Sequence, residues 1–186
     1  RFDLEIFNIK SIPIHGGSMR YYVRKIDKQK NEKISLKVIN LQKNELQKGY
    51  NVKETFLNYA TDVERTKLNL MNLLHKLKNN KKTIIGYGAS GRANTLIQYC
   101  NIDANLLDYI IDDSPMKQNY YTPKSHLEIR SRESLKEKMP DYILIFAWSF
   151  FNEIIEKNIS YLHKGVKFII PLPEVKIIFY QSGELS

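Results

Sequence analysis

The last hundred residues alternate short apolar runs with stretches in which apolar positions recur every three or four residues. Short runs rich in Ile, Leu, Tyr and Phe, without regular polar alternation, are typical of strands that helices cover on both faces. The alternation therefore predicts an α/β fold with a doubly wound, mostly parallel sheet. The predicted strands are 83–87, 107–112, 126–129, 142–147, 167–170 and 175–180, and the predicted helices are 91–100, 131–138 and 150–163.

A different pattern opens the chain, where two strand-like runs, 2–14 and 19–26, are separated by a Gly-Gly pair. Such runs joined by a glycine turn predict a β-hairpin. Two strands alone are marginally stable in water, so the hairpin either packs on the rest of the chain or belongs to a larger sheet that lies before the first residue. Residues 27–50 are mostly polar and are interpreted as a connector, with an apolar element at 34–41 that the pattern leaves unassigned.

A long amphipathic helix is predicted from Val52 to about Lys78, because apolar side chains recur along one face and charged residues fill the other. This is the pattern of a linker helix that lies on a neighbouring domain. The predicted organisation is a hairpin with its connector at 1–50, a linker helix at 51–80, and an α/β domain at 81–186.

A glycine-rich turn of the form GxGxxG joins the strand predicted at 83–87 to the helix predicted at 91–100. Its glycines let the backbone bend and approach a ligand closely, and free amides at a helix start attract anions. In this context the spacing indicates a Rossmann-like fold that binds a phosphate, although such turns also serve as plain packing joints. Asp112 and Asp113 end the next apolar run and are candidates to contact a ribose, or form an ordinary turn.

The chain is basic, with 29 Lys and Arg against 20 Asp and Glu and a formal charge of +9. The lysines are scattered through polar, asparagine-rich stretches, and no base-stacking aromatic pattern accompanies them. A solvated surface therefore explains the charge better than a nucleic-acid partner does, and a weak attraction for phosphorylated small molecules is compatible with it.

Cys100 is the only cysteine, so no intrachain disulfide can form and no cysteine-based metal site is expected within the chain. No apolar stretch approaches the roughly 20 residues that span a bilayer, and the first residues lack the charged-then-apolar order of a signal peptide. These features predict a cytoplasmic protein without a membrane partner.

Several separated motifs share their order with one protein family, and they are Gly86–Ser90, Asn94–Leu96, Tyr99–Cys100, Pro140–Tyr142, Ala147–Trp148, Glu153–Ile154, Pro171–Glu174 and, in the hairpin, His15–Arg20. Together they resemble the C-terminal domain of the sugar C-methyltransferases that act on nucleotide-linked ketodeoxysugars. The resemblance spans nearly all of 83–180. The His-Gly-Gly-Ser segment is similar to the closing hairpin of the family's S-adenosylmethionine-binding domain.

The resemblance implies a larger protein, in which a zinc-binding module and a central methyltransferase domain precede the Rossmann-like domain. The zinc ligands and the S-adenosylmethionine-binding glycine motif of that family are absent from this sequence. We therefore expect a part that cannot methylate alone, with S-adenosylmethionine held upstream, zinc in the missing module and no cofactor within this chain. The expected partners are a nucleotide diphosphate-linked sugar and the upstream methyltransferase domain.

The same resemblance implies roles for individual residues. His15 is expected to remove the proton next to the ketone, a task that suits an imidazole with a pKa near neutrality, unless it is a turn histidine bonded to solvent. Gly16 and Gly17 would permit close approach of the sugar, and Ser18 would form a hydrogen bond with it. Residues expected to bind the substrate are Gly86, Gly88, Ala89, Ser90, Gly91, Arg92, Asn94 and Trp148. The amides of Ala89, Ser90 and Gly91, together with Arg92, would lie near its diphosphate. The alternative for Asn94 is a first-turn residue that satisfies backbone donors, and Trp148 would either line the site or fill the core.

The sequence departs from the family pattern at several positions. Arg92-Ala93 stands where the family usually has Lys-Gly, and Ser149 stands where it has Asn. Arg92 keeps the positive charge of the lysine, and its guanidinium can donate two hydrogen bonds to one phosphate. These departures leave the predicted fold intact and bear on the details of substrate contact.

Two other functions compete with this interpretation. A GxGxxG turn followed by Asp112 also fits an NAD(P)-binding oxidoreductase domain, but no hydride-site constellation is evident. Tyr120 and Lys124 have the spacing of one such pair, yet they lie in a proline-containing loop instead of a helix. The third possibility is a non-catalytic docking domain that has lost an ancestral dinucleotide site.

Overall fold

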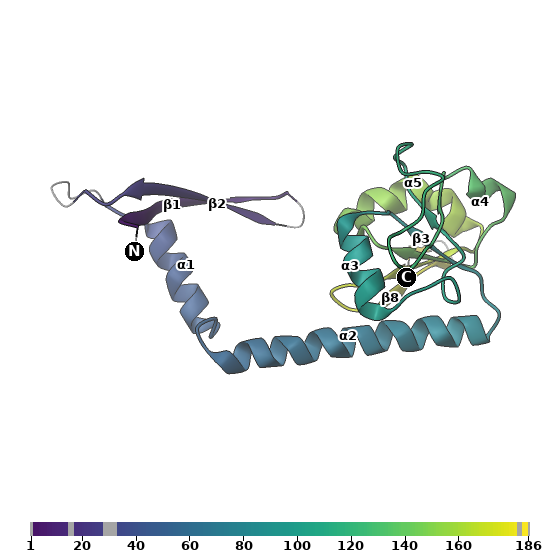
Figure 1. Cartoon of the computed structure of the whole chain (residues 1–186), viewed down its shortest axis with the longest axis horizontal. Coiled ribbons are helices and arrows are strands. Elements are labelled where there is room, and N and C mark those ends of the chain that lie inside the picture. Colours follow the sequence, from purple (N-terminus) through teal and green to yellow (C-terminus); the bar gives the residue numbers. More distant parts are fainter. Residues whose placement is uncertain (1, 15–16, 28–32, 182–183, 186) are drawn as a thin grey trace. The chain divides into compact units, whose positions relative to one another are not determined.

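The computed structural model describes residues 2–14, 17–27, 33–181 and 184–185. The chain divides into two compact units, Arg1–Thr61 and Asp62–Ser186. Their boundary lies inside α2 (Lys53–Asn79), the helix predicted as a linker, which is continuous over 27 residues (Figure 1).

The first unit contains the predicted hairpin, in which β1 (Leu4–Ile12) pairs antiparallel with β2 (Ser18–Lys25). An ion pair between Arg24 Nε and Glu5 Oε1, 2.8 Å apart, links the two strands. Alternation along the strands places four large apolar side chains on one face of the hairpin, and all four are 40–52% exposed: Leu4, Ile6, Tyr21 and Val23.

The segment interpreted as a connector contains a helix, α1 (Leu36–Gln47). Ser35 caps the start of this helix, because its Oγ accepts a hydrogen bond from the Lys37 N–H. The Ser35 N–H donates to the Phe7 carbonyl at 2.9 Å and so links the helix to the hairpin. Among the described residues of this unit, Ile9 of the hairpin and Val38 of the helix are the buried apolar side chains. Val38 is the one buried residue of α1, so its apolar positions do not mark a clear buried face and left this helix unassigned from the sequence.

The second unit contains a six-stranded sheet in the order β5-β4-β3-β6-β7-β8, parallel throughout except for the last pair. This arrangement confirms the predicted doubly wound, mostly parallel sheet. Its strands are β3 (Ile84–Tyr87), β4 (Ile110–Ile111), β5 (Ile129–Arg130), β6 (Tyr142–Ile145), β7 (Lys167–Ile170) and β8 (Lys176–Ile178).

Helices cover both faces of the sheet (Figure 1). The second half of α2 and α3 (Gly91–Cys100) share one buried cluster with the sheet. On the other face, α4 (Ser134–Glu137) and α5 (Phe151–His163) share a second cluster with it. A short antiparallel pair follows β8 and consists of β9 (Tyr180–Gln181) and β10 (Glu184–Leu185).

Several elements are shorter than predicted. Only two residues of the run 107–112 form β4, although Leu106 and Leu107 are fully buried, and the helix predicted at 131–138 reduces to the single turn of α4. Apolar periodicity reports burial, and loop side chains can be buried without joining a strand. The prediction of these elements was therefore right in position and wrong in extent.

At the amino ends of β3 and β6, Thr83 and Asp141 form reciprocal hydrogen bonds. The Asp141 carboxylate accepts from the Thr83 N–H at 2.8 Å and hydroxyl at 3.0 Å, and Lys82 Nζ lies 3.0 Å from its other oxygen. The Asp141 N–H in turn donates to the Thr83 hydroxyl at 2.9 Å. Burial raises the pKa of Asp141, but the bonds from Thr83 and Lys82 outweigh burial and hold this pKa below its ordinary value.

We expect Asp141→Asn to lower the free energy of unfolding by about 1 kcal/mol near neutral pH, since it removes a partly exposed, charge-assisted bond. Because the folded-state pKa is depressed, this stabilisation is present above the ordinary carboxyl pKa and is lost as the pH falls through the folded value. In urea unfolding, the gap in free energy between wild type and variant should begin to close below about pH 4 and should vanish as the pH falls through the folded-state pKa.

The matched control is Asp62→Asn, which removes an exposed helical carboxylate paired with Arg65 and should change stability little at any pH. A gap for Asp141→Asn that persists undiminished at about pH 2 would contradict this account of the carboxylate.

Candidate functional site

The strand order of the sheet reverses between β3 and β6. From β3 the chain crosses through α3 to β4 on one side, whereas from β6 it crosses through α5 to β7 on the other. Open α/β sheets bind ligands outside the carboxyl ends of their strands at such a switch point. Here the glycine turn follows β3, and Ala147 with the 3₁₀ turn Trp148–Phe150 follows β6.

The three glycines of the turn differ in the space around them. A Cβ on Gly86 would lie 2.6 Å from the ring of Phe146, so this glycine allows strands and side chains to pack. Gly88 has a φ of +93°, and a Cβ there would meet the Ala147 Cβ at 3.2 Å. A Cβ on Gly91 would meet nothing within 4 Å. The packing role therefore accounts for Gly86 and Gly88, while Gly91 opens onto free space.

Some backbone N–H groups of the glycine turn donate hydrogen bonds within the protein, and others do not. Ala89 donates to the Asp112 carboxylate at 2.7 Å, and the Ser90 hydroxyl caps α3 by accepting from the Ala93 N–H at 3.2 Å. Within the described part of the chain, no hydrogen bond satisfies the N–H groups of Ser90, Gly91 and Arg92. Because α3 begins here, these donors carry the partial positive charge of the helix start.

Arg92 lies beside the loop that follows β6. Its guanidinium carbon is 5.7 Å from the centre of the Trp148 ring, a cation–π distance, and Arg92 is exposed. The next residue of that loop, Ser149, has a buried hydroxyl without a partner among the described residues. Asn94 differs from these residues, because its Oδ1 accepts from Gln98 within the helix at 3.0 Å.

Polar side chains also meet on the face of the sheet that α5 covers. The buried Tyr87 hydroxyl donates to Asp113 Oδ2 at 3.0 Å. Burial, and then the bond to Asp113, raise the pKa of Tyr87 to about 12. Asn158 is fully buried, its Nδ2 donates to the Ile154 carbonyl at 2.6 Å, and its Oδ1 has no partner in the described structure. The sequence analysis missed Tyr87 and Asn158, since each lies in an apolar pattern that indicates only burial.

The residues predicted in the hairpin lie in the first unit. His15 and Gly16 fall outside the described residues. Gly17 has a φ of +119°, and the Ser18 hydroxyl donates to the Ile14 carbonyl at 3.0 Å. The predicted catalytic and sugar-binding roles of this segment remain predictions.

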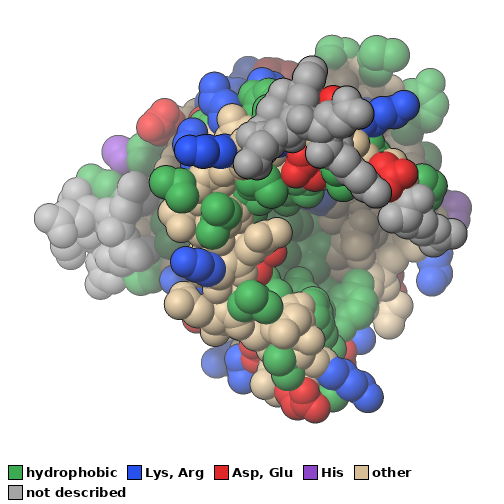
Figure 2. Space-filling view, turned by 90° about the vertical axis from the view of Figure 1, so that its left-hand side faces the viewer, with side chains coloured by type: hydrophobic (Ala, Val, Ile, Leu, Met, Phe, Trp, Pro, Cys, Tyr) green, Lys and Arg blue, Asp and Glu red, His purple; other side chains and the backbone are tan. Residues whose placement is uncertain are grey.

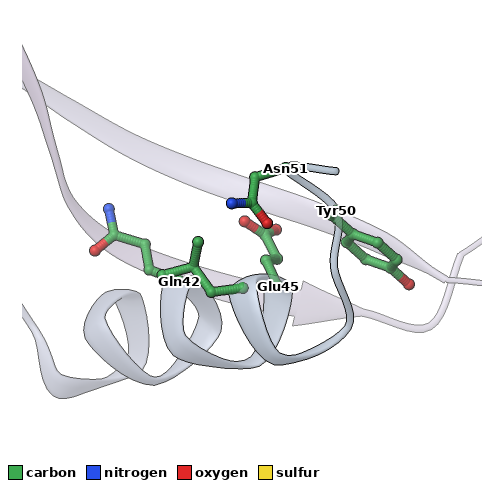
Figure 3. A pocket seen from close by; sticks show the side chains of 5 residues that line it. Gln42, Glu45, Tyr50 and Asn51 are labelled. Atoms are coloured by element: carbon green, nitrogen blue, oxygen red, sulfur yellow. The ribbon is translucent and has the colours of Figure 1, made fainter. Parts of the chain in front are cut away.

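An open cavity of about 360 Å³ lies at the end of α1, and its lining comes from that helix and the turn after it (Figure 3). The lining contains one carboxylate, two carboxamides and no basic group, so it offers little to a phosphate. The residues are Gln42, Glu45, Leu46, Tyr50 and Asn51.

On the face shown in Figure 2, Lys and Arg side chains lie among acidic and hydrophobic ones and do not gather into one described basic patch. Across the described residues, no three His, Cys, Asp or Glu side chains group closely enough to hold a metal ion. The same residues contain no helix with the length and apolar character needed to cross a bilayer.

Comparison with known proteins agrees with the motifs. The family described as the C-methyltransferase C-terminal domain matches residues 13–173. The chain is also similar to the C-methyltransferase NovU of Streptomyces niveus, at 26% identity over 179 residues that cover 96% of this chain and 42% of that protein. The chain thus spans less than half the length of this relative. Since the family match covers most of the sequence, the chain belongs to the C-methyltransferase C-terminal domain family.

Proposed function

We propose that this chain is the C-terminal part of an S-adenosylmethionine-dependent C-methyltransferase that acts on a nucleotide-linked deoxyketosugar. Its α/β unit would bind the nucleotide diphosphate and help to close the site. The observation that carries this proposal is the set of unsatisfied N–H groups at Ser90, Gly91 and Arg92, at the switch point of the sheet.

The chemistry of these groups suits a diphosphate. Backbone N–H groups at a helix start and a guanidinium both donate to phosphate oxygens, and charge-assisted bonds are the stronger kind. The cation–π contact with Trp148 holds the Arg92 guanidinium beside the start of α3. The indole ring would form an apolar wall of the proposed site. Ser149, with its free buried hydroxyl, adds one more donor from the same loop.

The hairpin would contribute to the methyltransferase domain. Two strands alone cannot cover the apolar face formed by Leu4, Ile6, Tyr21 and Val23, and packing of this face against an upstream domain would bury it. His15 would then remove the proton from the carbon to be methylated. S-adenosylmethionine would supply the methyl group from that upstream domain, and zinc would belong to the N-terminal module.

Two alternatives follow from the same fold. In an NAD(P)-binding domain, Asp112 would have to be available to a ribose, whereas its carboxylate accepts from Ala89, Ser114 and Lys117. In a non-catalytic docking domain, the glycine turn would be a packing joint only, a role for which Gly86 and Gly88 have the geometry.

We expect the chain to bind a pyrimidine nucleoside diphosphate, and Arg92→Ala to weaken this binding about tenfold because it removes a charge-assisted bond. Isothermal titration measures both affinities, with NADH as the comparison ligand. Arg65→Ala, which removes an equally charged and exposed side chain from α2, should leave the affinity unchanged.

Three results would each refute this function. Tight binding of NADH alone would favour the oxidoreductase, and unchanged affinity in Arg92→Ala together with a bulky substitution at Gly88 would favour the docking domain. If the folded wild type binds neither ligand, the glycine turn has no binding role in this chain.

We expect the 186-residue chain alone to give no transfer of a tritium-labelled methyl group from S-adenosylmethionine to a nucleotide-linked ketosugar. Joined to the methyltransferase domain it should turn over, and His15→Gln should then reduce the rate by about 10²–10⁴, the usual contribution of a general base. Turnover by the isolated chain, or an unchanged rate in His15→Gln, would contradict these roles.

A further inference from the structure

We propose that Asp113, held by Tyr87, is the acceptor for a sugar hydroxyl of the bound nucleotide, and that Asp112 is not. This inference rests on the proposed function and adds a second subsite next to the diphosphate. Tyr87 acts in it as a positioning residue, because its hydroxyl orients the carboxylate that would touch the ligand.

Asp112 matches the sequence spacing of a ribose-binding acid, yet its carboxylate is already occupied. Oδ2 accepts from the Ala89 N–H at 2.7 Å and lies 3.1 Å from Lys117 Nζ, while Oδ1 accepts from the Ser114 N–H at 2.9 Å. The residue is only 8% exposed. It therefore fastens the end of β4 to the glycine turn, and a pair of sugar hydroxyls would have to displace protein donors to reach it.

Asp113 presents the opposite case. It follows Asp112 directly, so its backbone lies beside the glycine turn, and its side chain is exposed. Tyr87 is its one hydrogen-bond partner in the described structure, no Lys or Arg there forms an ion pair with it, and its Oδ1 is free. An exposed carboxylate with one oxygen fixed and the other open is suited to accept from a hydroxyl group.

Asn158 supplies the second, independent observation. Its Oδ1 is buried and has no partner in the described structure, and its amide lowers the pKa of Tyr87, as an N–H that donates to the phenol oxygen does. A buried phenol cannot turn to water when it loses an acceptor. Tyr87 therefore keeps Asp113 Oδ2 as its acceptor, and Oδ1 of the same carboxylate stays open to a ligand.

The test compares two probes, a pyrimidine nucleoside diphosphate, which carries the sugar, and inorganic pyrophosphate, which does not. Asp113→Asn should weaken the nucleoside diphosphate about tenfold by isothermal titration and leave pyrophosphate as tight as before or tighter, since a negative charge is removed. Tyr87→Phe, with its fold checked by circular dichroism, should show the same selective loss to a smaller degree. Asp103→Asn makes the same charge change before β4 and should alter neither affinity.

A purely electrostatic role for Asp113 would tighten both probes, and that result would overturn the inference while leaving the diphosphate site intact. Equal loss of both probes would mean that Asp113 only maintains the fold, which also overturns it. If wild type binds neither probe, the proposed function itself fails, and this subsite fails with it.

Discussion

The close approach of Gly88 to Ala147 is the constraint on which the site depends. At this point the turn after β3 passes so near the loop after β6 that a Cβ on residue 88 would lie 3.2 Å from the Ala147 side chain, and the backbone there has a φ of +93°. The approach brings the start of α3 and the Trp148 loop together where the strand order reverses. A larger residue at 88 would separate the two loops and divide the site, because the left-handed backbone and the contact both require glycine.

Much of this arrangement could be predicted from the sequence. The strand, glycine turn and helix from 83 to 100 form as the pattern indicates, and so does the doubly wound sheet, because buried strands leave a strong apolar signal. The hydrogen-bond partners of individual polar groups could not be predicted from the sequence. Asp112 and Asp113 are adjacent acids in the sequence. Only the fold shows that the Asp112 carboxylate accepts a hydrogen bond from the Ala89 N–H, whereas Asp113 has one bond, from Tyr87, and one free oxygen. Likewise, α1 has a cap at Ser35 and a single buried side chain, Val38, which give too little periodicity to be recognised.

Family membership and the proposed substrate rest on different observations. The match over 13–173 shows a C-methyltransferase C-terminal domain. The diphosphate site is inferred from unsatisfied donors, an exposed guanidinium and an indole at a switch point. Under the proposed function, a domain of this kind would complete a methyl-transfer site that another domain supplies. Substrate binding and methyl transfer would then be divided between domains, so closure around the nucleotide would be coupled to catalysis.

The most direct test of the diphosphate site is a map of backbone amide shifts by ¹H–¹⁵N nuclear magnetic resonance as a pyrimidine nucleoside diphosphate is added. We predict that the shifts concentrate at Ser90–Ala93 and Ala147–Ser149, where the two loops meet. Shifts confined to the cavity at the end of α1, or no shifts at saturating ligand, would contradict the central claim that the switch point binds the nucleotide.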